Sequence, residues 1–387
     1  MKAVKIVTII GARPQIIKAA ALSRAIREKF SNEINEVIVH TGQHYDENMS
    51  QVFFDELEIP RTHYNLQVGS ASHGVQTARM IEGIEQVLMV ERPDFIVLYG
   101  DTNSTLAGAV SASKMHIPVA HIEAGLRSFN KSMPEEINRI LCDHCSTLLF
   151  SPTKTGYDNL INEGFKPENL APYNADNPAV YHCGDVMYDN SLYFGRLSDS
   201  KSCFLKENNL DPNRFILCTI HRDNNTDQPE RLNSIFRALI EISRQGNQNI
   251  FIPLHPRTAK LLAKNLVAEV YAELMACASI IVAPPASFIE MIQLEKNASV
   301  IITDSGGVQK EAYFFDKPCI ILRPETEWKE IVEAGTAIIA DADEAAIIGA
   351  WKKFSESPPT NFPKIFGDGS AAEFIIAEII KNAKVTQ

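Results

Sequence analysis

The chain has 387 residues, 45% of them hydrophobic and 22% charged, with a formal net charge of −11. This length exceeds that of one ordinary domain, so we expect two domains, each with its own core. The acidic balance disfavours nucleic acid and anionic membrane surfaces as main partners; since no apolar run is long enough to span a membrane and no signal-peptide layout is present, we expect a cytoplasmic protein.

The seven cysteines are odd in number and lie in apolar stretches, which favours reduced thiols over a disulfide framework. Cys142 and Cys145 form a C-x-x-C pair, but no second ligand pair follows at zinc spacing. Ordinary helix packing is therefore the expected role of this pair, and no metal site is expected.

The first half alternates strands with helices. A β-branched strand at 4–10 runs into Gly11-Ala-Arg-Pro14 and a helix at 15–30. Arg13 and Lys18 thus lie at the carboxyl end of the first strand and in the first turn of its helix, where open parallel sheets bind ligands. Two solvated charges are the simpler alternative. The next expected elements are a strand at 36–40, an amphipathic helix at 48–58 and a helix ending at Val90.

Two later strands each end in a carboxylate. The strand at 95–99 is followed by Gly100-Asp101, and the strand at 119–122 is followed at once by Glu123. The carboxyl ends of parallel strands meet at one edge of a sheet, so we expect Asp101 and Glu123 to lie there together as functional acids.

A helix beginning at Pro134 carries Glu135 and Glu136 in its first turn. At least one of these acids is expected only to complement the helix dipole and to pair with Arg139.

A Pro-, Asn- and Asp-rich segment at 166–178 interrupts the alternation and marks a domain boundary. The second half again places polar residues at strand ends, among them His221 and His255. Its most informative strand, 300–303, runs into Asp304-Ser-Gly-Gly307 and a helix.

Glycines let a backbone approach an anion, and a helix N-terminus attracts negative charge, so Ser305, Gly306 and Gly307 are predicted to hold a phosphate. Glu311, one helical turn later, would accept the hydroxyls of a ribose. A plain capped turn is the alternative.

The alternation predicts an α/β fold with two Rossmann-like parallel-sheet domains facing a cleft. We expect an N-terminal domain at 1–180, a C-terminal domain at 181–365, and a terminal segment at 366–387 that contains a helix. Neither half carries the glycine signatures of NAD-binding proteins or P-loop NTPases, so no such cofactor is expected.

Seven motifs together resemble the non-hydrolysing UDP-N-acetylglucosamine 2-epimerase family, and they occur in order across nearly the whole chain. They are Gly11-Ala-Arg-Pro14, Thr41-Gly-Gln-His44, Gly100-Asp-Thr102, His121-Ile-Glu-Ala-Gly-Leu-Arg127, Pro134-Glu-Glu-Ile-Asn-Arg139, His221-Arg222 and Asp304-Ser-Gly-Gly307.

The resemblance implies a GT-B type fold, with the C-terminal helix packing back on the first domain, and usually a homodimer. It implies no cofactor. The implied substrate is a UDP-linked 2-acetamido sugar, inverted at C2 by elimination and re-addition of UDP, for cell-surface polysaccharide synthesis.

The resemblance also implies residue roles. The matching catalytic residues are Asp101, Glu123, Glu135 and His221. The matching UDP-binding residues are Arg13, Ser305, Gly306, Gly307 and Glu311, and Met291 stands where an aromatic residue that stacks on uracil is expected. We add Lys18 and His255 as substrate-binding residues because of their places at the ligand edges.

Several positions depart from the family's usual motifs, and the departures resemble those of the UDP-2,3-diacetamido-2,3-dideoxy-glucuronate 2-epimerase subgroup. Gln15 replaces a glutamate, which would make room for a second anion such as a C6 carboxylate. A UDP-linked uronate is therefore predicted to be the better substrate. Trp328 replaces an arginine, and Val75 replaces an arginine that binds an allosteric UDP-sugar in some members, so that regulation is not expected.

Three other functions share much of this pattern. A GT-B glycosyltransferase would share the nucleotide turn but needs one base and an acceptor groove. A hydrolysing epimerase differs by water access, and a non-catalytic UDP-sugar sensor would not need the acids.

Overall fold

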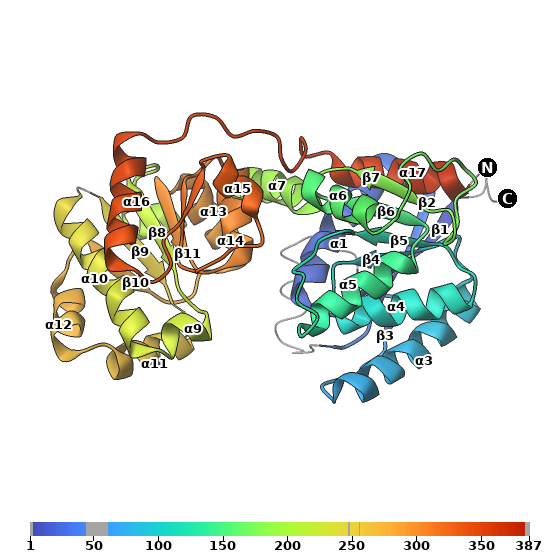
Figure 1. The fold of residues 1–387 in the computed structure, drawn as a ribbon, viewed down its shortest axis with the longest axis horizontal. Helices are drawn as coiled ribbons and strands as arrows, with labels where there is room; N and C mark the ends of the chain where they lie inside the picture. Colours follow the sequence, from blue (N-terminus) through green and yellow to red (C-terminus); the bar gives the residue numbers. More distant parts are fainter. Residues whose placement is uncertain (1–2, 44–60, 247, 255, 384–387) are drawn as a thin grey trace. The chain divides into compact units, whose positions relative to one another are not determined.

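The computed structural model describes residues 3–43, 61–246, 248–254 and 256–383 (Figure 1). The chain divides into two compact units, called unit 1 (Met1–Asn190 with Lys364–Gln387) and unit 2 (Ser191–Pro363). The amphipathic helix expected at 48–58 and the side chain of His255 lie outside the described residues.

Unit 1 is built on a seven-stranded sheet with the order β3-β2-β1-β4-β5-β6-β7, in which every paired strand is parallel. Its strands are β1 (Val4–Ile10), β2 (Ile34–His40), β3 (Tyr64–Asn65), β4 (Phe95–Tyr99), β5 (Val119–Ile122), β6 (Leu148–Ser151) and β7 (Ala179–His182). Its helices are α1 (Arg13–Ala25), the π-helical turn η1 (Ile26–Phe30), α3 (His73–Glu91), α4 (Asn103–Lys114), α5 (Pro134–His144), α6 (Lys154–Asn162) and α17 (Ala371–Ala383); α7 (Val186–Lys201) contains the unit boundary.

Unit 2 is built on a six-stranded parallel sheet with the order β10-β9-β8-β11-β12-β13. Its strands are β8 (Phe215–Thr219), β9 (Asn249–Pro253), β10 (Ile280–Ala283), β11 (Val300–Thr303), β12 (Cys319–Ile321) and β13 (Ala337–Ile339). Its helices are α8 (Phe204–Glu207), α9 (Asp223–Thr226), α10 (Pro229–Gln245), α11 (Pro256–Asn265), α12 (Ala268–Ala276), α13 (Phe288–Asn297), α14 (Gly306–Phe314), α15 (Lys329–Glu333) and α16 (Glu344–Glu356).

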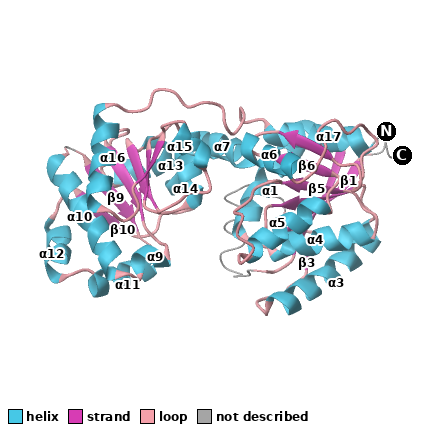
Figure 2. Cartoon of the chain, in the orientation of Figure 1, coloured by secondary structure: helices cyan, strands magenta, loops and turns pink. Residues whose placement is uncertain are grey.

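Helices flank the strands of each unit on both faces (Figure 2). Consequently the central strands are apolar along their whole length, as parallel strands covered on both sides must be. Every residue of β4 is buried, and so is every residue of β8 and β11. These two sheets confirm the predicted α/β fold class with two parallel-sheet domains.

Each sheet reverses its strand order at one point. In unit 1 the reversal lies between β1 and β4, and in unit 2 it lies between β8 and β11. Open α/β sheets bind ligands at the carboxyl ends of the strands at such a switch point. The loops after these four strands begin at Gly11, Gly100, Ile220 and Asp304, so most of the predicted site residues follow a switch-point strand.

Helix α17 belongs to unit 1, although it lies at the end of the chain. Its first turn is capped by Asp189 of α7, whose carboxylate accepts hydrogen bonds from the backbone N–H groups of Ala371 at 3.3 Å and Ala372 at 2.8 Å. The Tyr181 hydroxyl donates to Glu378 at 2.8 Å. These contacts and the packing of α17 on α1 hold the terminal helix on this unit.

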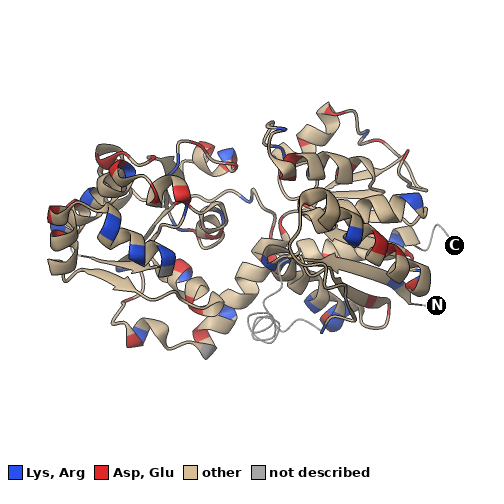
Figure 3. Ribbon diagram, turned by 90° about the horizontal axis from the view of Figure 1, so that it is seen from below, with Lys and Arg blue, Asp and Glu red and all other residues tan. Residues whose placement is uncertain are grey.

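Charged residues lie mainly on helices and loops, with both signs interspersed over each unit (Figure 3). Among the described residues, no helix is both long and apolar enough to cross a membrane.

Candidate active site

The turn between β1 and α1 is fixed by Gln15, which is only 1% exposed. Its Oε1 accepts from the N–H groups of Gly11 at 2.9 Å and Ala12 at 3.2 Å, and its Nε2 donates to the Tyr99 carbonyl at 2.9 Å and Thr105 Oγ1 at 3.0 Å. The side chain is thus fully occupied in joining β1 to β4. The prediction that Gln15 makes room for a second anion assumed that its side chain lies beside the sugar. That assumption is wrong, because the side chain is buried and bonded within the protein.

Lys18 extends from α1 to the carboxylate of Glu123, at the end of β5, and forms an ion pair with it. Glu123 has φ +70°, a left-handed conformation that L-residues rarely adopt. A Cβ added to Gly100 would come within 3.1 Å of Glu123 Oε2 and 3.2 Å of Lys18 Nζ. The glycine after β4 therefore leaves room for this pair at the switch point.

Asp101 follows β4, which is paired with β5, the strand that precedes Glu123. Its Oδ2 accepts from Arg139 Nη2 at 2.5 Å, and Arg139 Nη1 donates to Glu136 at 2.8 Å. Glu136 is 1% exposed and also accepts from the N–H groups of Ser128 and Phe129 at 2.9 and 2.8 Å. Burial alone would raise the pKa of Glu136, but these hydrogen bonds and Arg139 hold it below its usual value.

Glu135, the third predicted acid, is exposed in the first turn of α5, next to the buried Glu136. Arg13 is exposed at the first position of α1. The pairing expected for one of the two glutamates with Arg139 is therefore made by Glu136.

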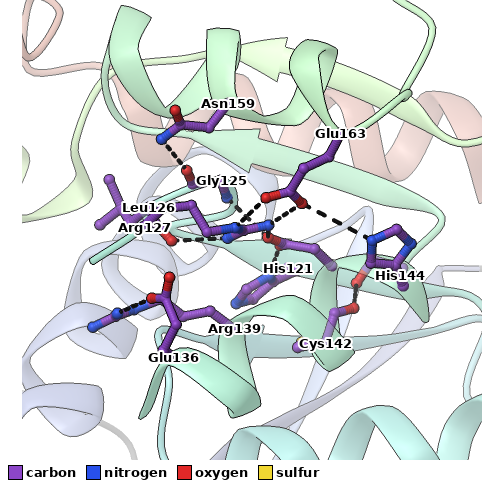
Figure 4. Close-up of polar contacts among 12 residues, drawn as sticks. His121, Gly125, Leu126, Arg127, Glu136, Arg139, Cys142, His144, Asn159 and Glu163 are labelled. Carbon is purple, nitrogen blue, oxygen red and sulfur yellow. Dashed lines mark hydrogen bonds and ion pairs between the residues drawn. The ribbon is translucent and has the colours of Figure 1, made fainter. Parts of the chain in front are cut away.

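A second ion network joins His121, Asp143, Arg127 and Glu163 (Figure 4). His121, Asp143 and Arg127 are buried, and Glu163 at the outer end is 28% exposed. His121 Nδ1 is 2.7 Å from Asp143 Oδ1, and its Nε2 is 2.8 Å from the Gly100 carbonyl oxygen. Asp143 Oδ2 accepts from Arg127 Nη2 at 2.7 Å and from the Gly125 N–H at 3.1 Å. Arg127 in turn donates to both oxygens of Glu163, from Nε at 2.6 Å and Nη2 at 2.7 Å.

Both ring nitrogens of His121 face oxygen acceptors, so each must carry a proton and the ring is an imidazolium. Burial alone would lower the pKa of His121, but the facing Cys142 and Asp143 raise it well above its ordinary value. Likewise, burial would raise the pKa of Asp143, but His121 and Arg127 keep it below its ordinary value.

In unit 2, Asp304 organises the loop after β8. Its carboxylate is fully buried and accepts from the N–H groups of His221 and Arg222 and from Asn225 Nδ2, all at 3.1 Å. His221 Nδ1 lies 2.9 Å from Asp304 Oδ1, which leaves Nε2 for a ligand. Burial alone would raise the pKa of Asp304, but the hydrogen bonds from His221 and the loop hold it below its usual value.

The turn after β11 has the features expected of an anion site. Ser305 caps α14, with its Oγ accepting from the Val308 N–H at 3.4 Å. A Cβ added to Gly307 would lie 3.8 Å from Ser305 Oγ and 4.0 Å from Glu311 Oε2, so the glycine turn and the glutamate share one side of the helix start. The indole N–H of Trp328 donates to the Gly306 carbonyl at 2.9 Å.

Glu311 is accompanied by a second carboxyl group, Glu295 of α13, which is 2% exposed. Burial first, and then the neighbouring Glu311, raise the pKa of Glu295 well above its ordinary value.

Several residues that support the site were not predicted from the sequence. They are Asp143, Glu163, Asp304 as the acceptor that orders the loop after β8, and the buried Gln15 and Glu295. A histidine inside the apolar strand 119–122 was an available signal, because a buried polar side chain needs partners.

Met291 is partly buried in the first turn of α13. Within the described residues, no group of three or more His, Cys, Asp or Glu side chains is arranged to hold a metal ion.

Comparisons with known proteins agree with this arrangement. The family model for UDP-N-acetylglucosamine 2-epimerase matches residues 26–381. A Methanococcus maripaludis protein named UDP-N-acetylglucosamine 2-epimerase homolog is 46% identical over 379 residues, covering 98% of this chain and 99% of the relative. A Pseudomonas aeruginosa protein named UDP-2,3-diacetamido-2,3-dideoxy-D-glucuronate 2-epimerase is 44% identical over 378 residues, covering 97% of this chain and 99% of the relative.

Among solved structures, the UDP-GlcNAc 2-epimerase of Methanocaldococcus jannaschii in complex with UDP-GlcNAc and UDP is 39% identical, with a TM-score of 0.79. The match covers 97% of this chain and 99% of that one. The protein described here therefore belongs to the UDP-N-acetylglucosamine 2-epimerase family.

Proposed function

We propose that this protein is a non-hydrolysing UDP-sugar 2-epimerase, which inverts C2 of a UDP-linked 2-acetamido sugar of the UDP-GlcNAc type. One observation carries the proposal: the carboxyl ends of the strands at or next to each switch point present one of the two kinds of group that the reaction needs. Unit 1 presents the carboxylates of Asp101 and Glu123, with Lys18 and Arg139 against them. Unit 2 presents His221 and a capped glycine turn suited to a diphosphate.

The chemistry explains why acids and an anion site are both required. C2 has no adjacent carbonyl, so its proton cannot leave as an enolate. In the proposed route a carboxylate removes the C2 proton while the C1–O bond breaks, giving UDP and a 2-acetamido glycal. UDP then adds back to C1, and an acid returns a proton to the opposite face of C2. Cationic groups and hydrogen-bond donors stabilise the departing diphosphate.

The residue roles follow this division. Asp101, Glu123 and Glu135 are proposed for proton transfer, and His221 for the leaving diphosphate. The proposed substrate-binding residues are Arg13, Lys18, His255, Met291, Ser305, Gly306, Gly307 and Glu311. The Methanocaldococcus relative was solved in complex with UDP-GlcNAc and UDP, which supports the same ligand class for this chain.

A second candidate substrate is a UDP-2,3-diacetamido-2,3-dideoxy-glucuronate. It is favoured by the Pseudomonas relative of that name, which is 44% identical and matches nearly the whole chain.

Proton NMR in D2O with each of these two nucleotide sugars tests the proposal. We expect both C2 epimers to appear, with deuterium at C2 and no accumulation of UDP at equilibrium. Stoichiometric UDP and free sugar would instead identify a hydrolysing epimerase, and transfer to an acceptor without epimerisation would identify a glycosyltransferase. Binding of both sugars without any turnover would identify a sensor.

The proposal extends to assembly and location: a homodimer that acts in the cytoplasm and supplies a sugar for cell-surface polysaccharide. The family resemblance supports the homodimer and the polysaccharide role. Light scattering tests the first, with an expected mass of twice 43.0 kDa.

A further inference from the structure

We propose that His121 and Asp143 are positioning residues, which hold the two strand ends that carry Asp101 and Glu123 in the geometry needed for proton transfer at C2. This inference rests on the proposed function. It concerns two buried side chains whose hydrogen bonds end on main-chain atoms next to the acids.

The first of these bonds fixes the end of β4. His121 lies within β5, opposite Leu98 of β4, and is fully buried. Its Nε2 donates to the carbonyl of Gly100 at 2.8 Å. Gly100 has φ +62° and immediately precedes Asp101, so a bond to its carbonyl fixes the direction in which the chain presents Asp101.

The second bond fixes the end of β5. The carboxylate of Asp143, on α5, accepts from the Gly125 N–H at 3.1 Å through Oδ2, while its Oδ1 binds His121 Nδ1 at 2.7 Å. Gly125 has φ +79° and follows Glu123, which has φ +70°. A non-glycine residue in this conformation is strained and persists only where its surroundings hold it. The hydrogen bond from the Gly125 N–H to Asp143 provides part of this restraint.

The network is rigid enough for this role. His121 and Asp143 are 0% exposed, and Arg127 continues the chain of charges to Glu163. Two cations and two anions alternate, with the partly exposed Glu163 at the outer end, so the charges of the network compensate one another. A single carboxylate, Asp143, therefore links the turn after β4, through His121, to the turn after β5.

The position of these bonds explains why their loss should affect the reaction and not only the fold. A displacement of about 1 Å at a reacting group lowers a rate about 100-fold. Binding of UDP to the glycine turn of unit 2 uses none of these atoms, so it gives an independent measure of intact protein.

The main variant is His121→Asn. The shorter amide can still donate to Asp143 but no longer reaches the Gly100 carbonyl. We expect kcat to fall about 100-fold, with KM and the Kd for UDP within about threefold of the wild type. Glu163→Gln is the matched control: it removes one charge from the outer end of the same network without touching either strand end, and kcat should stay within about threefold.

A third variant, Asp143→Asn, separates geometry from charge. The amide oxygen can accept from Gly125 while the amide nitrogen donates to a neutral His121, whose Nε2–H still reaches Gly100. Most of kcat should therefore remain.

The proposal is overturned if folded His121→Asn keeps a wild-type kcat, or if kcat falls equally in His121→Asn and Glu163→Gln in proportion to their loss of Tm. If His121→Asn does not fold, Asp143→Asn decides: a 100-fold loss of kcat with UDP affinity retained overturns the positioning role. Wild-type protein is assayed in parallel. If it binds UDP but does not epimerise either sugar, the proposed function itself is rejected.

Discussion

Lys18 in α1 and Glu123 after β5 form an ion pair, although 105 residues separate them in the chain. Their side chains are only 14% and 9% exposed. Salt screens such a pair much less than it screens exposed charges. The pair joins a predicted substrate-binding lysine directly to a predicted catalytic acid.

The variants Glu123→Gln and Lys18→Met should therefore behave differently. Glu123→Gln keeps the shape of the side chain but removes its capacity to take a proton, so turnover should fall about 100- to 10,000-fold with a modest loss of stability. Lys18→Met leaves the largely buried carboxylate without its lysine and should cost more stability, on the order of 3 kcal/mol. NMR turnover assays and urea unfolding measure the two effects. Wild-type turnover in Glu123→Gln would remove Glu123 from the catalytic set.

Asp101→Asn should lower turnover and leave UDP binding intact, whereas Ser305→Ala should weaken UDP binding. Asp101 is proposed to act only in the reaction, so its amide variant should bind UDP normally and lose turnover. Ser305 both caps α14 and faces the proposed diphosphate, so Ser305→Ala should weaken UDP binding about tenfold and cost about 1 kcal/mol of stability.

Asp343→Ala provides the matched control for the lost cap. Asp343 caps α16 of the same unit, accepting from the Ala346 N–H at 2.7 Å, and lies outside the predicted site. Isothermal calorimetry with UDP should show an unchanged Kd for this variant. If Asp343→Ala weakened UDP binding as much as Ser305→Ala does, the effect at Ser305 would come from general destabilisation.

Gln15→Glu should affect stability rather than substrate choice. A carboxylate at this buried position cannot donate to the Tyr99 carbonyl or to Thr105, and it would face the Tyr99 oxygen. We expect a loss of about 2 to 4 kcal/mol in the free energy of unfolding. The ratio of kcat/KM for the uronate and for UDP-GlcNAc should stay the same, because the side chain does not face an open edge. A changed ratio at unchanged stability would restore Gln15 as a specificity residue.

Asp189 should make the stability of unit 1 depend on pH. Burial, which outweighs the hydrogen bonds from α17, raises the pKa of Asp189 from 3.8 to about 6. The folded state therefore binds a proton more tightly than the unfolded state, so its contribution is fully present below about pH 4 and is lost as pH rises through about 6.

Asp189→Asn isolates this contribution, because an amide does not titrate in this range. As pH falls from about 7 to about 4, the unfolding free energy of the wild type should rise relative to that of Asp189→Asn. Urea unfolding of both proteins at several pH values measures the difference. A difference that does not change over this range would show that the carboxylate is solvated.

The sequence by itself determined the fold class and the order of the motifs. The β-branched runs at 4–10, 95–99 and 300–303 are apolar because covered parallel strands are buried on both faces, and that pattern is local. The positions of Asp101, Glu123 and Ser305 immediately after strands placed them at sheet edges, because parallel strands end at a common edge. The glycine turn after 303 was identified for the same local reason.

Only the tertiary structure decided which side chains meet. Gln15 was expected to lie beside the sugar, but the approach of β1 to β4 buries it, and its hydrogen bonds run to Tyr99 and Thr105. Glu135 and Glu136 are adjacent in the chain, but only Glu136 is buried, because the loop at 128–129 packs over it and donates two backbone N–H groups to its carboxylate. Asp143 reaches His121 and Gly125 only because the fold brings α5 to the end of β5. Such contacts join residues far apart in sequence, and strand and helix periodicities contain no information about which distant side chains they bring together.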